Sequence, residues 1–209
     1  MYLPAHFEIT DPAALHELVR RHPLAMWATV VDGLPVVNHV PFRLDAARGE
    51  HGTLVGHVAR ANPVWRTPAP SVLAFRAADG YVSPNGYAAK REHGKVVPTW
   101  NYAVVHAHGT PRIVDDRDAL LAIVTALTTE HEAAQAHPWA VNDAPADYVE
   151  QMLRAIVGIE IPVQRWVGKF KLSQNRSGAD VVGVVAGLRQ QQPAGGEALA
   201  GWMQEYAPR

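Results

Sequence analysis

The sequence predicts an α+β protein whose centre is a closed or nearly closed antiparallel β-barrel, with helices at its periphery. Two observations lead to this prediction. Short runs rich in valine and aromatic residues recur along the chain and are separated by turn residues such as Asp32-Gly33. One helical pattern precedes these runs, and the other helical patterns follow most of them. Such an order is typical of one sheet that closes on itself and carries helices around it.

Length and composition indicate a globular protein without cysteine chemistry. The 209 residues are enough for one sizeable core and marginal for two. Hydrophobic residues make up 48% and charged residues 19%, which is too apolar for disorder. A net charge of −1 offers no basic footprint for nucleic acid. Because there is no cysteine, disulfides, thiolate catalysis and cysteine-based metal sites are excluded.

The first residues, MYLPAHFEIT, lack the charged and apolar regions of a signal peptide. No apolar run of the chain is long enough to cross a bilayer. We therefore expect a cytoplasmic protein with no membrane partner.

The first elements are a helix and a β-hairpin. Thr10-Asp11-Pro12 predicts a helix start, and His22-Pro23 ends the helix. The run Leu24–Val31 predicts a strand, Asp32-Gly33 a tight turn, and Leu34–Leu44 the returning strand.

The middle of the chain predicts further strands and one loop. The strands are expected at Thr53–Ala59, Pro70–Arg76, Tyr81–Pro84 and Val96–Val114, with a turn at Ala78–Gly80 and a loop over residues 85–95 that could lie over a site.

The last third predicts mainly helices. They are expected from Asp115 to Glu132, from Asp143 through Leu153, at Ala179–Arg189 and at Glu197–Tyr206, with a strand at Arg154–Val163 and a linker at Gln190–Gly196. We expect residues 1–190 to form the main domain and residues 191–209 a linker with a short terminal helix.

Several polar residues interrupt the apolar strands. Asn38 and His39 lie in the middle of the predicted hairpin, and His57 interrupts the next strand. The simpler interpretation is a half-exposed strand whose polar side faces water. Arg60 and Asn62 follow in a polar turn, where a guanidinium could hold a phosphate. The alternative is an ordinary strand-end turn with a solvated arginine.

His106 and His108 stand two residues apart on a predicted strand and could share a metal. No third ligand is identifiable by spacing, so we predict no metal site. The later stretch Arg165–Asn175 combines lysines, hydroxyls and Trp166, which suits either an anionic ligand or a surface strand end.

Six motifs in register resemble one known family. They are MYLPAHF, NHVPF, GHVARANPVW, YVSPNGY, VVPTWNYAVVHAHG and KFKLSQNR. Together they resemble the PaiB-type family, the FMN-binding negative transcriptional regulators of the split-barrel flavin-binding superfamily. The resemblance implies a six-stranded antiparallel split barrel and a homodimer, with one FMN in each of two clefts between subunits.

The resemblance also implies cofactor contacts. By position, Asn38, His39 and Val40 would line the isoalloxazine edge, and His57, Arg60 and Asn62 would lie at the ribityl phosphate. The other contacts implied are Trp100, Asn101 and Tyr102, and Lys171 from the partner chain. The chain departs from the family pattern at Asn85-Gly86, where a bulkier pair is expected, and this could leave more room above the flavin ring.

The resemblance leaves the activity open. One hypothesis is a transcriptional regulator or redox sensor, and DNA is a partner by resemblance, although the charge does not support it. A second is an FMN-dependent oxidoreductase or flavin reductase acting on a small substrate, with His57, His106 or Tyr102 as candidate acid or base. A third is a haem-binding or haem-degrading relative with a ligand such as His106. The fourth is a barrel without a cofactor. The sequence identifies no catalytic residue.

Overall fold

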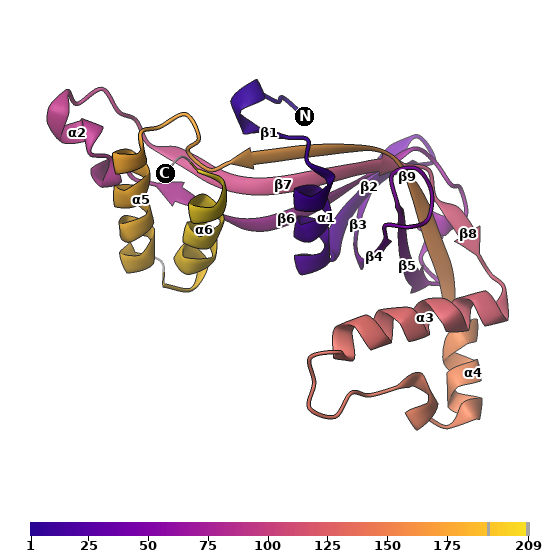
Figure 1. Ribbon diagram of the computed structural model, residues 1–209. Helices are drawn as coiled ribbons and strands as arrows, with labels where there is room; N and C mark the ends of the chain where they lie inside the picture. The colour runs from indigo at the N-terminus through magenta and orange to yellow at the C-terminus, as the bar shows by residue number, and fades with distance from the viewer. Residues whose placement is uncertain (192, 208–209) are drawn as a thin grey trace. The chain divides into compact units, whose positions relative to one another are not determined.

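The structure is a computed structural model that describes residues 1–191 and 193–207 (Figure 1). Its described residues form one mostly antiparallel sheet and six α-helices, so the predicted mixture of strands and peripheral helices is confirmed. The strand order is β3-β2-β6-β7-β9-β5-β4, and β1 and β8 also pair with β9. The described sheet thus has nine strands, and the expected number of six is wrong.

The strands are β1 (Glu8–Ile9), β2 (Leu24–Val31), β3 (Leu34–Pro41), β4 (Arg43–Asp45), β5 (Thr53–Ala59), β6 (Ser71–Val82), β7 (Thr99–Gly109), β8 (Arg112–Val114) and β9 (Ile156–Lys171). The α-helices are α1 (Pro12–Arg21), α2 (Ala89–Glu92), α3 (Arg117–Glu132), α4 (Ala146–Arg154), α5 (Gly178–Gln191) and α6 (Pro193–Tyr206). Short 3-10 turns are η1 (Ala5–Phe7), η2 (Pro63–Trp65), η3 (Pro84–Gly86) and η4 (Val141–Asp143). No helix among the described residues is long and apolar enough to span a membrane.

The chain divides into two compact units. Unit 1 comprises Met1–Arg21, Arg76–Val105 and Val167–Arg209, and unit 2 comprises His22–Phe75 and His106–Trp166. Strands β6, β7 and β9 each contribute residues to both units. The domain boundary expected after residue 190 stays a prediction.

The β2–β3 hairpin in unit 2 follows the sequence prediction. Asp32 (φ 51°) and Gly33 (φ 79°) both adopt the left-handed backbone that a tight two-residue turn requires. Alternation gives the hairpin two faces. Its inner face carries Ala25 and Trp27, both fully buried, whereas its outer face carries exposed residues such as Met26.

The predicted strand Leu34–Leu44 is two strands joined by Phe42. Before Phe42 the chain pairs with β2, and after it the chain pairs with β5. The ring of Phe42 is buried, and its N–H donates to the carbonyl of Pro23 (2.9 Å). A β-carbon on Gly56 would lie 2.8 Å from the carbonyl oxygen of Pro41, so this close crossing requires glycine.

The hydrogen-bonded sheet does not close at this strand switch. The hydrogen-bonded order ends at β3 and β4, and in the described residues no pairing joins these two strands. The expected closed or nearly closed hydrogen-bonded barrel is therefore corrected to an open path. Since β3 and β4 are separated only by Phe42, the covalent chain connects the two ends.

Two strands are longer than predicted. Strand β6 runs through the expected turn at Ala78–Gly80, where Asp79 accepts a hydrogen bond from Trp100 Nε1 (2.8 Å) and pairs with Arg76. Strand β9 continues past Val163 to Lys171. Pairing with neighbouring strands overrides the local turn and proline signals.

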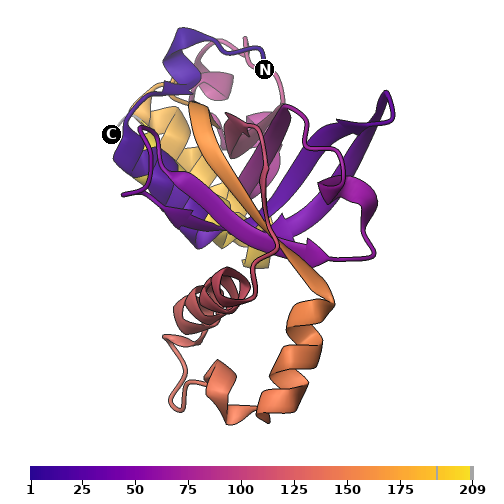
Figure 2. The ribbon, with the colours of Figure 1, turned by 90° about the vertical axis from the view of Figure 1, so that its right-hand side faces the viewer.

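In unit 2, helix α3 packs on the sheet through Leu120, Ile123 and Leu127. Ile123 and Leu127 form a buried cluster with Val55 of β5. The helix begins at Asp116, whose carboxylate accepts from the N–H groups of the first turn. Helix α4 lies beside α3, and η4 belongs to the segment that connects them (Figure 2).

In unit 1, helices α5 and α6 lie side by side (Figure 1). They occupy most of the segment expected as the linker Gln190–Gly196, although residue 192 lies outside the described residues. The expected loop over residues 85–95 contains η3 and α2. It is fixed to α5 because Gly86 and Gly183 meet without side chains and Asp180 accepts from Ala89 N–H (3.0 Å).

Candidate functional site

The outer face of the β2–β3 hairpin is an exposed apolar surface in unit 2. By register it consists of Leu24, Met26, Ala28 and Val30 on β2, and of Pro35, Val37, His39 and Pro41 on β3. Leu24 is 59% exposed, Val37 51% and Met26 44%. His39 is the one ionisable side chain on this face and is exposed. Soluble proteins rarely leave such a continuous apolar surface without a partner.

The structure separates the three residues expected at the isoalloxazine edge. His39 lies on the outer face, whereas Asn38 and Val40 lie on the inner face, opposite Trp27 and Ala25. Val40 is buried in the core. The strand alternation visible in the sequence already places these side chains on opposite faces.

Asn38 and Asn62 come together in unit 2. Asn62 Nδ2 donates to Asn38 Oδ1 (2.8 Å), and Asn62 Oδ1 accepts from the N–H of Val64 at the start of η2. The pair therefore ties the turn after β5 to strand β3. Asn38 Nδ2 is buried and has no hydrogen-bond partner within the described chain, so this amide keeps one unused donor.

Arg60 is held by internal partners. Its Nε donates to the carbonyl of Arg154 (2.8 Å), and Nη2 donates to the carbonyl of Ile156 (2.9 Å). Both terminal nitrogens also bind the carboxylate of Asp115. The hydrogen bond from Arg60 lowers the pKa of the Asp115 carboxyl. Arg60 thus fixes the start of β9, and the carboxylate of Asp115 offsets its charge. These partners do not support the expected phosphate contact.

His57 faces helix α3. Its cross-strand partner is Gly158, and a β-carbon on Gly158 would lie 2.9 Å from Ile123 Cδ1 of α3. His57 Nδ1 is buried without a hydrogen-bond partner among the described residues. Burial lowers the pKa of His57 and favours the neutral imidazole. This position is a helix–sheet interface rather than an exposed phosphate cradle.

Trp100, Tyr102 and Lys171 lie in unit 1. Trp100 is 51% exposed, and its ring meets that of Tyr81 edge to face. Lys171 Nζ donates to Thr99 Oγ1 and to the carbonyl of Trp100 (2.9 Å). Burial and then the charge of Lys169 lower the pKa of Lys171. These residues form a half-exposed polar and aromatic surface.

Asn101 lies on the opposite side of β7, in the interior of unit 1. It is 1% exposed, and its Nδ2 donates to Ser173 Oγ (2.9 Å) and Met203 Sδ (3.5 Å). The structure therefore gives Asn101 an interior role that joins β7 to α6, and its burial does not support the expected contact with the cofactor.

The sequence reasoning missed the contact between Lys169 and Tyr2. Lys169 is 8% exposed, and its Nζ donates to the carbonyl of Tyr2 (3.1 Å). The same ammonium lies 5.6 Å from the centre of the Tyr2 ring and 5.4 Å from that of Tyr102. The motifs MYLPAHF and KFKLSQNR contain these residues, but 167 positions separate them, so spacing alone gives no sign of the contact.

The histidine pair on β7 lies in a partly buried environment. The rings of His106 and His108 are 6.5 Å apart, and burial lowers the pKa of both. No group of three potential metal ligands occurs among the described residues.

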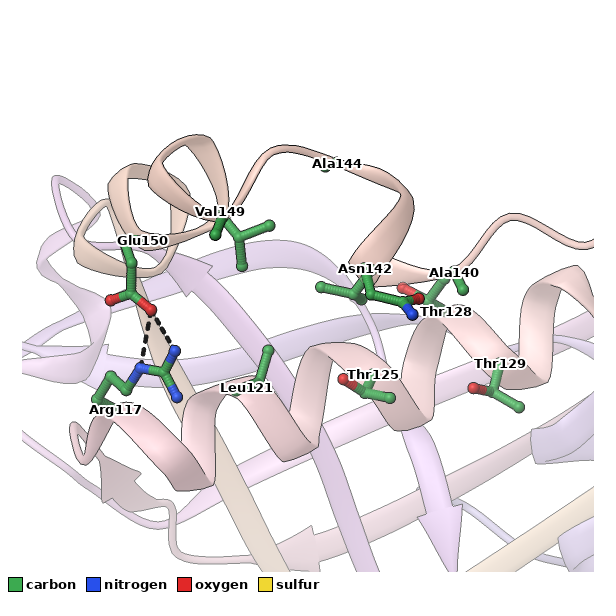
Figure 3. A pocket seen from close by; sticks show the side chains of 12 residues that line it. Arg117, Leu121, Thr125, Thr128, Thr129, Ala140, Asn142, Ala144, Val149 and Glu150 are labelled. Atoms are coloured by element: carbon green, nitrogen blue, oxygen red, sulfur yellow. Dashed lines mark hydrogen bonds and ion pairs between the residues drawn. The ribbon is translucent and has the colours of Figure 1, made fainter.

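A separate cavity of about 470 Å³ lies in unit 2 between α3, η4 and α4 (Figure 3). Leu121 and Val149 supply apolar walls, and Thr125 and Asn142 supply polar ones. Arg117 and Glu150 bind each other across one end, so their charges are mutually satisfied. None of the residues expected to contact the cofactor lines this cavity.

Comparison with known families defines the class of protein. Residues 1–165 match a family model described as "Putative FMN-binding domain". The chain therefore belongs to this FMN-binding family of flavoproteins, and FMN is the cofactor that membership assigns to it.

One curated relative is similar to the chain in sequence, and two solved structures are similar to it in fold. The chain is 29% identical to "Protease synthase and sporulation protein PAI 2" of Bacillus subtilis, over 98% of this chain and 97% of the relative. The fold resembles a FAD and heme binding protein from Mycobacterium smegmatis (TM-score 0.57, 22% identity, 86% and 80% of the two chains). It also resembles the flavocytochrome Anf3 from Azotobacter vinelandii (TM-score 0.54, 12% identity, 78% and 69%). The resemblance to the PaiB-type family is thereby confirmed.

Each unit, taken by itself, carries features that FMN binding requires. A flat ring system needs an apolar wall, which the outer face of the β2–β3 hairpin provides. The pyrimidine edge needs donors and acceptors, and β3, at one end of the described strand order, has unpaired backbone groups. In unit 1, the ammonium of Lys171 has no carboxylate partner among the described residues, and a phosphate requires such a cation.

Proposed function

We propose that this protein is a homodimeric FMN-binding redox sensor with a regulatory role, in which FMN lies against the outer face of the β2–β3 hairpin and a second copy covers it. The observation that carries this proposal is the exposed apolar surface of that hairpin, where Leu24, Met26 and Val37 are each more than 40% exposed. A two-fold dimer would bury the same patch on both copies and create two equivalent clefts.

Particular residues would hold the cofactor. His39 is the side chain able to bind a polar edge on the otherwise apolar outer face. Asn62, through its hydrogen bond to Asn38, would fix the position of β3 from the inner face of the hairpin. We assign Trp100, Tyr102 and Lys171 of the second copy as a further set of contacts, in which the lysine ammonium binds the phosphate and the rings exclude water.

FMN, when bound, supplies the electron-transfer chemistry that protein side chains lack. The chain itself would orient the ring on the hairpin, exclude water from it and fix the phosphate. A sensor needs only this binding and a change of affinity or of dimer contacts with oxidation state.

Direct DNA binding receives no support from the charge distribution. No described helix carries more than two Lys or Arg residues, and the pair in α1 is at its last turn, where Arg20 and Arg21 follow an apolar stripe. A groove-reading helix requires a denser cationic face. We therefore expect no shift of duplex DNA in a gel at moderate salt, and a clear shift would contradict this expectation.

An FMN-dependent oxidoreductase is the second candidate. The buried ammonium of Lys169, two residues before Lys171 on β9, supports it, because a second cation could hold an anionic substrate. Oxidation of NADH or NADPH by the FMN-loaded protein, faster than by free FMN, would favour this candidate over the sensor.

The primary test is visible absorption and mass in solution after addition of FMN, and separately of haem. We expect flavin bands, altered flavin fluorescence and a dimer. Met26→Glu and Val37→Glu should each yield monomer and weaken FMN binding by about tenfold or more, because a buried charge opposes both contacts.

Val182→Glu on α5 is the matched control, since Val182 is also a valine and is 70% exposed in unit 1. Normal dimerisation and FMN affinity in Met26→Glu would refute the proposed face. An intense Soret band with haem and no flavin binding would favour the haem alternative.

A further inference from the structure

We propose that Lys169 and Lys171, flanked by Tyr2 and Tyr102, form an oxyanion site in unit 1, and that the backbone carbonyl of Tyr2 holds the place of the ligand oxygen. The ligand would carry a phosphate or a carboxylate. All four residues belong to unit 1.

The first support is a buried charge without a counter-ion. Lys169 is 8% exposed, and its ammonium has only the neutral carbonyl of Tyr2 as a hydrogen-bond acceptor among the described residues. No carboxylate of the described chain lies within ion-pair distance of Lys169 or Lys171. Proteins seldom bury an ammonium group without an anionic partner, because the desolvation cost is high.

The second support is the position of Lys171. It stands two residues after Lys169 on β9, so both side chains lie on the same side of the strand. Its ammonium already binds Thr99 Oγ1 and the carbonyl of Trp100. An ammonium has three donors, so one remains for a ligand oxygen.

The aromatic rings give the site its walls. The ammonium nitrogen of Lys169 lies 5.6 Å from the ring centre of Tyr2 and 5.4 Å from that of Tyr102. Both distances are within the range of cation–π attraction. Tyr2 is 84% exposed and Met1 51% exposed, so the N-terminal residues make few contacts that would hold them in place. An anionic oxygen forms a stronger hydrogen bond with an ammonium than a neutral carbonyl does and would displace it.

The oxyanion could come from either of two sources. One is the phosphate of FMN, and this source rests on the proposed function. The other is a separate small molecule with a phosphate or carboxylate group, such as the substrate of an oxidoreductase. The shared chemistry is an oxyanion, and the two sources differ in whether flavin is required.

The first experiment needs no flavin. Full-length flavin-free protein with 13C-labelled tyrosine rings is titrated with inorganic phosphate at constant ionic strength. We expect saturable shifts of the Tyr2 and Tyr102 ring signals. Lys169→Met should weaken phosphate binding at least tenfold, whereas Lys169→Arg should retain it. Lys90→Met is the matched control, because Lys90 is an exposed lysine of unit 1 on α2.

The result that overturns the site is the absence of saturable shifts in the wild type, or equal shifts in Lys169→Met. Retained binding by Lys169→Arg shows that a loss in Lys169→Met reflects the charge and not misfolding. Because flavin is absent, this result does not depend on the proposed function.

The second experiment separates the sources by comparing FMN with riboflavin, which lacks the phosphate. If the FMN phosphate occupies the site, Lys169→Met weakens FMN binding at least tenfold and leaves riboflavin binding unchanged. If a separate ligand occupies it, both flavins bind normally and the FMN-loaded wild type still binds inorganic phosphate. Both sources are contradicted if Lys169→Met leaves FMN affinity unchanged and the FMN-loaded wild type does not bind inorganic phosphate.

Discussion

At the scale of single residues, the partners of a side chain decide what it can do more than its chemical type does. The guanidinium of Arg60 is a group that can bind a phosphate. However, the carboxylate of Asp115 offsets its charge, and two backbone carbonyls accept further hydrogen bonds from it. Lys169 has no such carboxylate. The two cations therefore differ in their capacity for a new anion.

Arg60→Lys should lower the melting temperature and leave FMN affinity within about twofold of the wild type. A lysine ammonium cannot reproduce the planar fork that spans the carbonyls of Arg154 and Ile156 and the Asp115 carboxylate. Thermal unfolding and flavin titration measure the two effects. Arg66→Lys is the control, since no hydrogen bond or ion pair of its side chain is present in the described chain. A large loss of FMN affinity with unchanged stability would instead indicate that Arg60 binds the FMN phosphate.

His57 makes stability depend on pH. Burial lowers its pKa below the ordinary value of 6.5, so on acidification the unfolded chain binds this proton before the folded one. The His57 contribution is present above about pH 6.5 and is lost as the pH falls toward the lowered folded value. His57→Gln should lose less stability than the wild type between about pH 7 and pH 5 in denaturant unfolding. Identical losses would show that His57 takes no part.

At the scale of elements, close crossings between strands and helices depend on glycine. Gly56 allows the Pro41–Phe42 crossing, and Gly158 allows α3 to approach the sheet. The two contacts lie on opposite faces of the β5–β9 pair, because Gly56 is paired with Ile159 and Gly158 with His57.

Gly56→Ala should destabilise the protein by about 1–3 kcal/mol, because the new β-carbon meets the backbone carbonyl of Pro41 and the Phe42 ring. Gly187→Ala, inside α5, meets nothing within 4 Å and should be neutral or stabilising. Denaturant unfolding of the two variants measures the difference. Equal stabilities would mean that the crossing can relax.

Local signals were sufficient for β2, β5 and the turn between β2 and β3, whose bounds match the sequence prediction. They failed where distant pairing decides, as in β6, which passes through Ala78–Gly80, and in the long β9. The candidate site shows the same division. The polar residues were visible in the sequence, but the Arg60–Asp115 pair and the Lys169–Tyr2 contact join positions 55 and 167 residues apart.

At the scale of the whole molecule, binding of FMN and pairing of two copies should reinforce each other. Two copies of the 22.8 kDa chain give a mass of about 46 kDa, which light scattering can distinguish from the monomer. FMN at about 100 times its dissociation constant should raise the free energy of unfolding by about 2.7 kcal/mol. Thermal unfolding with and without FMN measures this gain, and riboflavin at the same excess of its own constant is the comparison.

Strand β9 pairs with β1, β5, β7 and β8, yet it is the last strand of the chain. During synthesis, the earlier strands therefore emerge before the neighbour that completes their pairing. The residues of the apolar β2–β3 hairpin are synthesised long before residue 171 leaves the ribosome. Until then the hairpin is exposed without the complete sheet. The nascent chain should accordingly bind chaperones until β9 arrives, and the completed sheet should form slowly because its contacts join distant parts of the sequence.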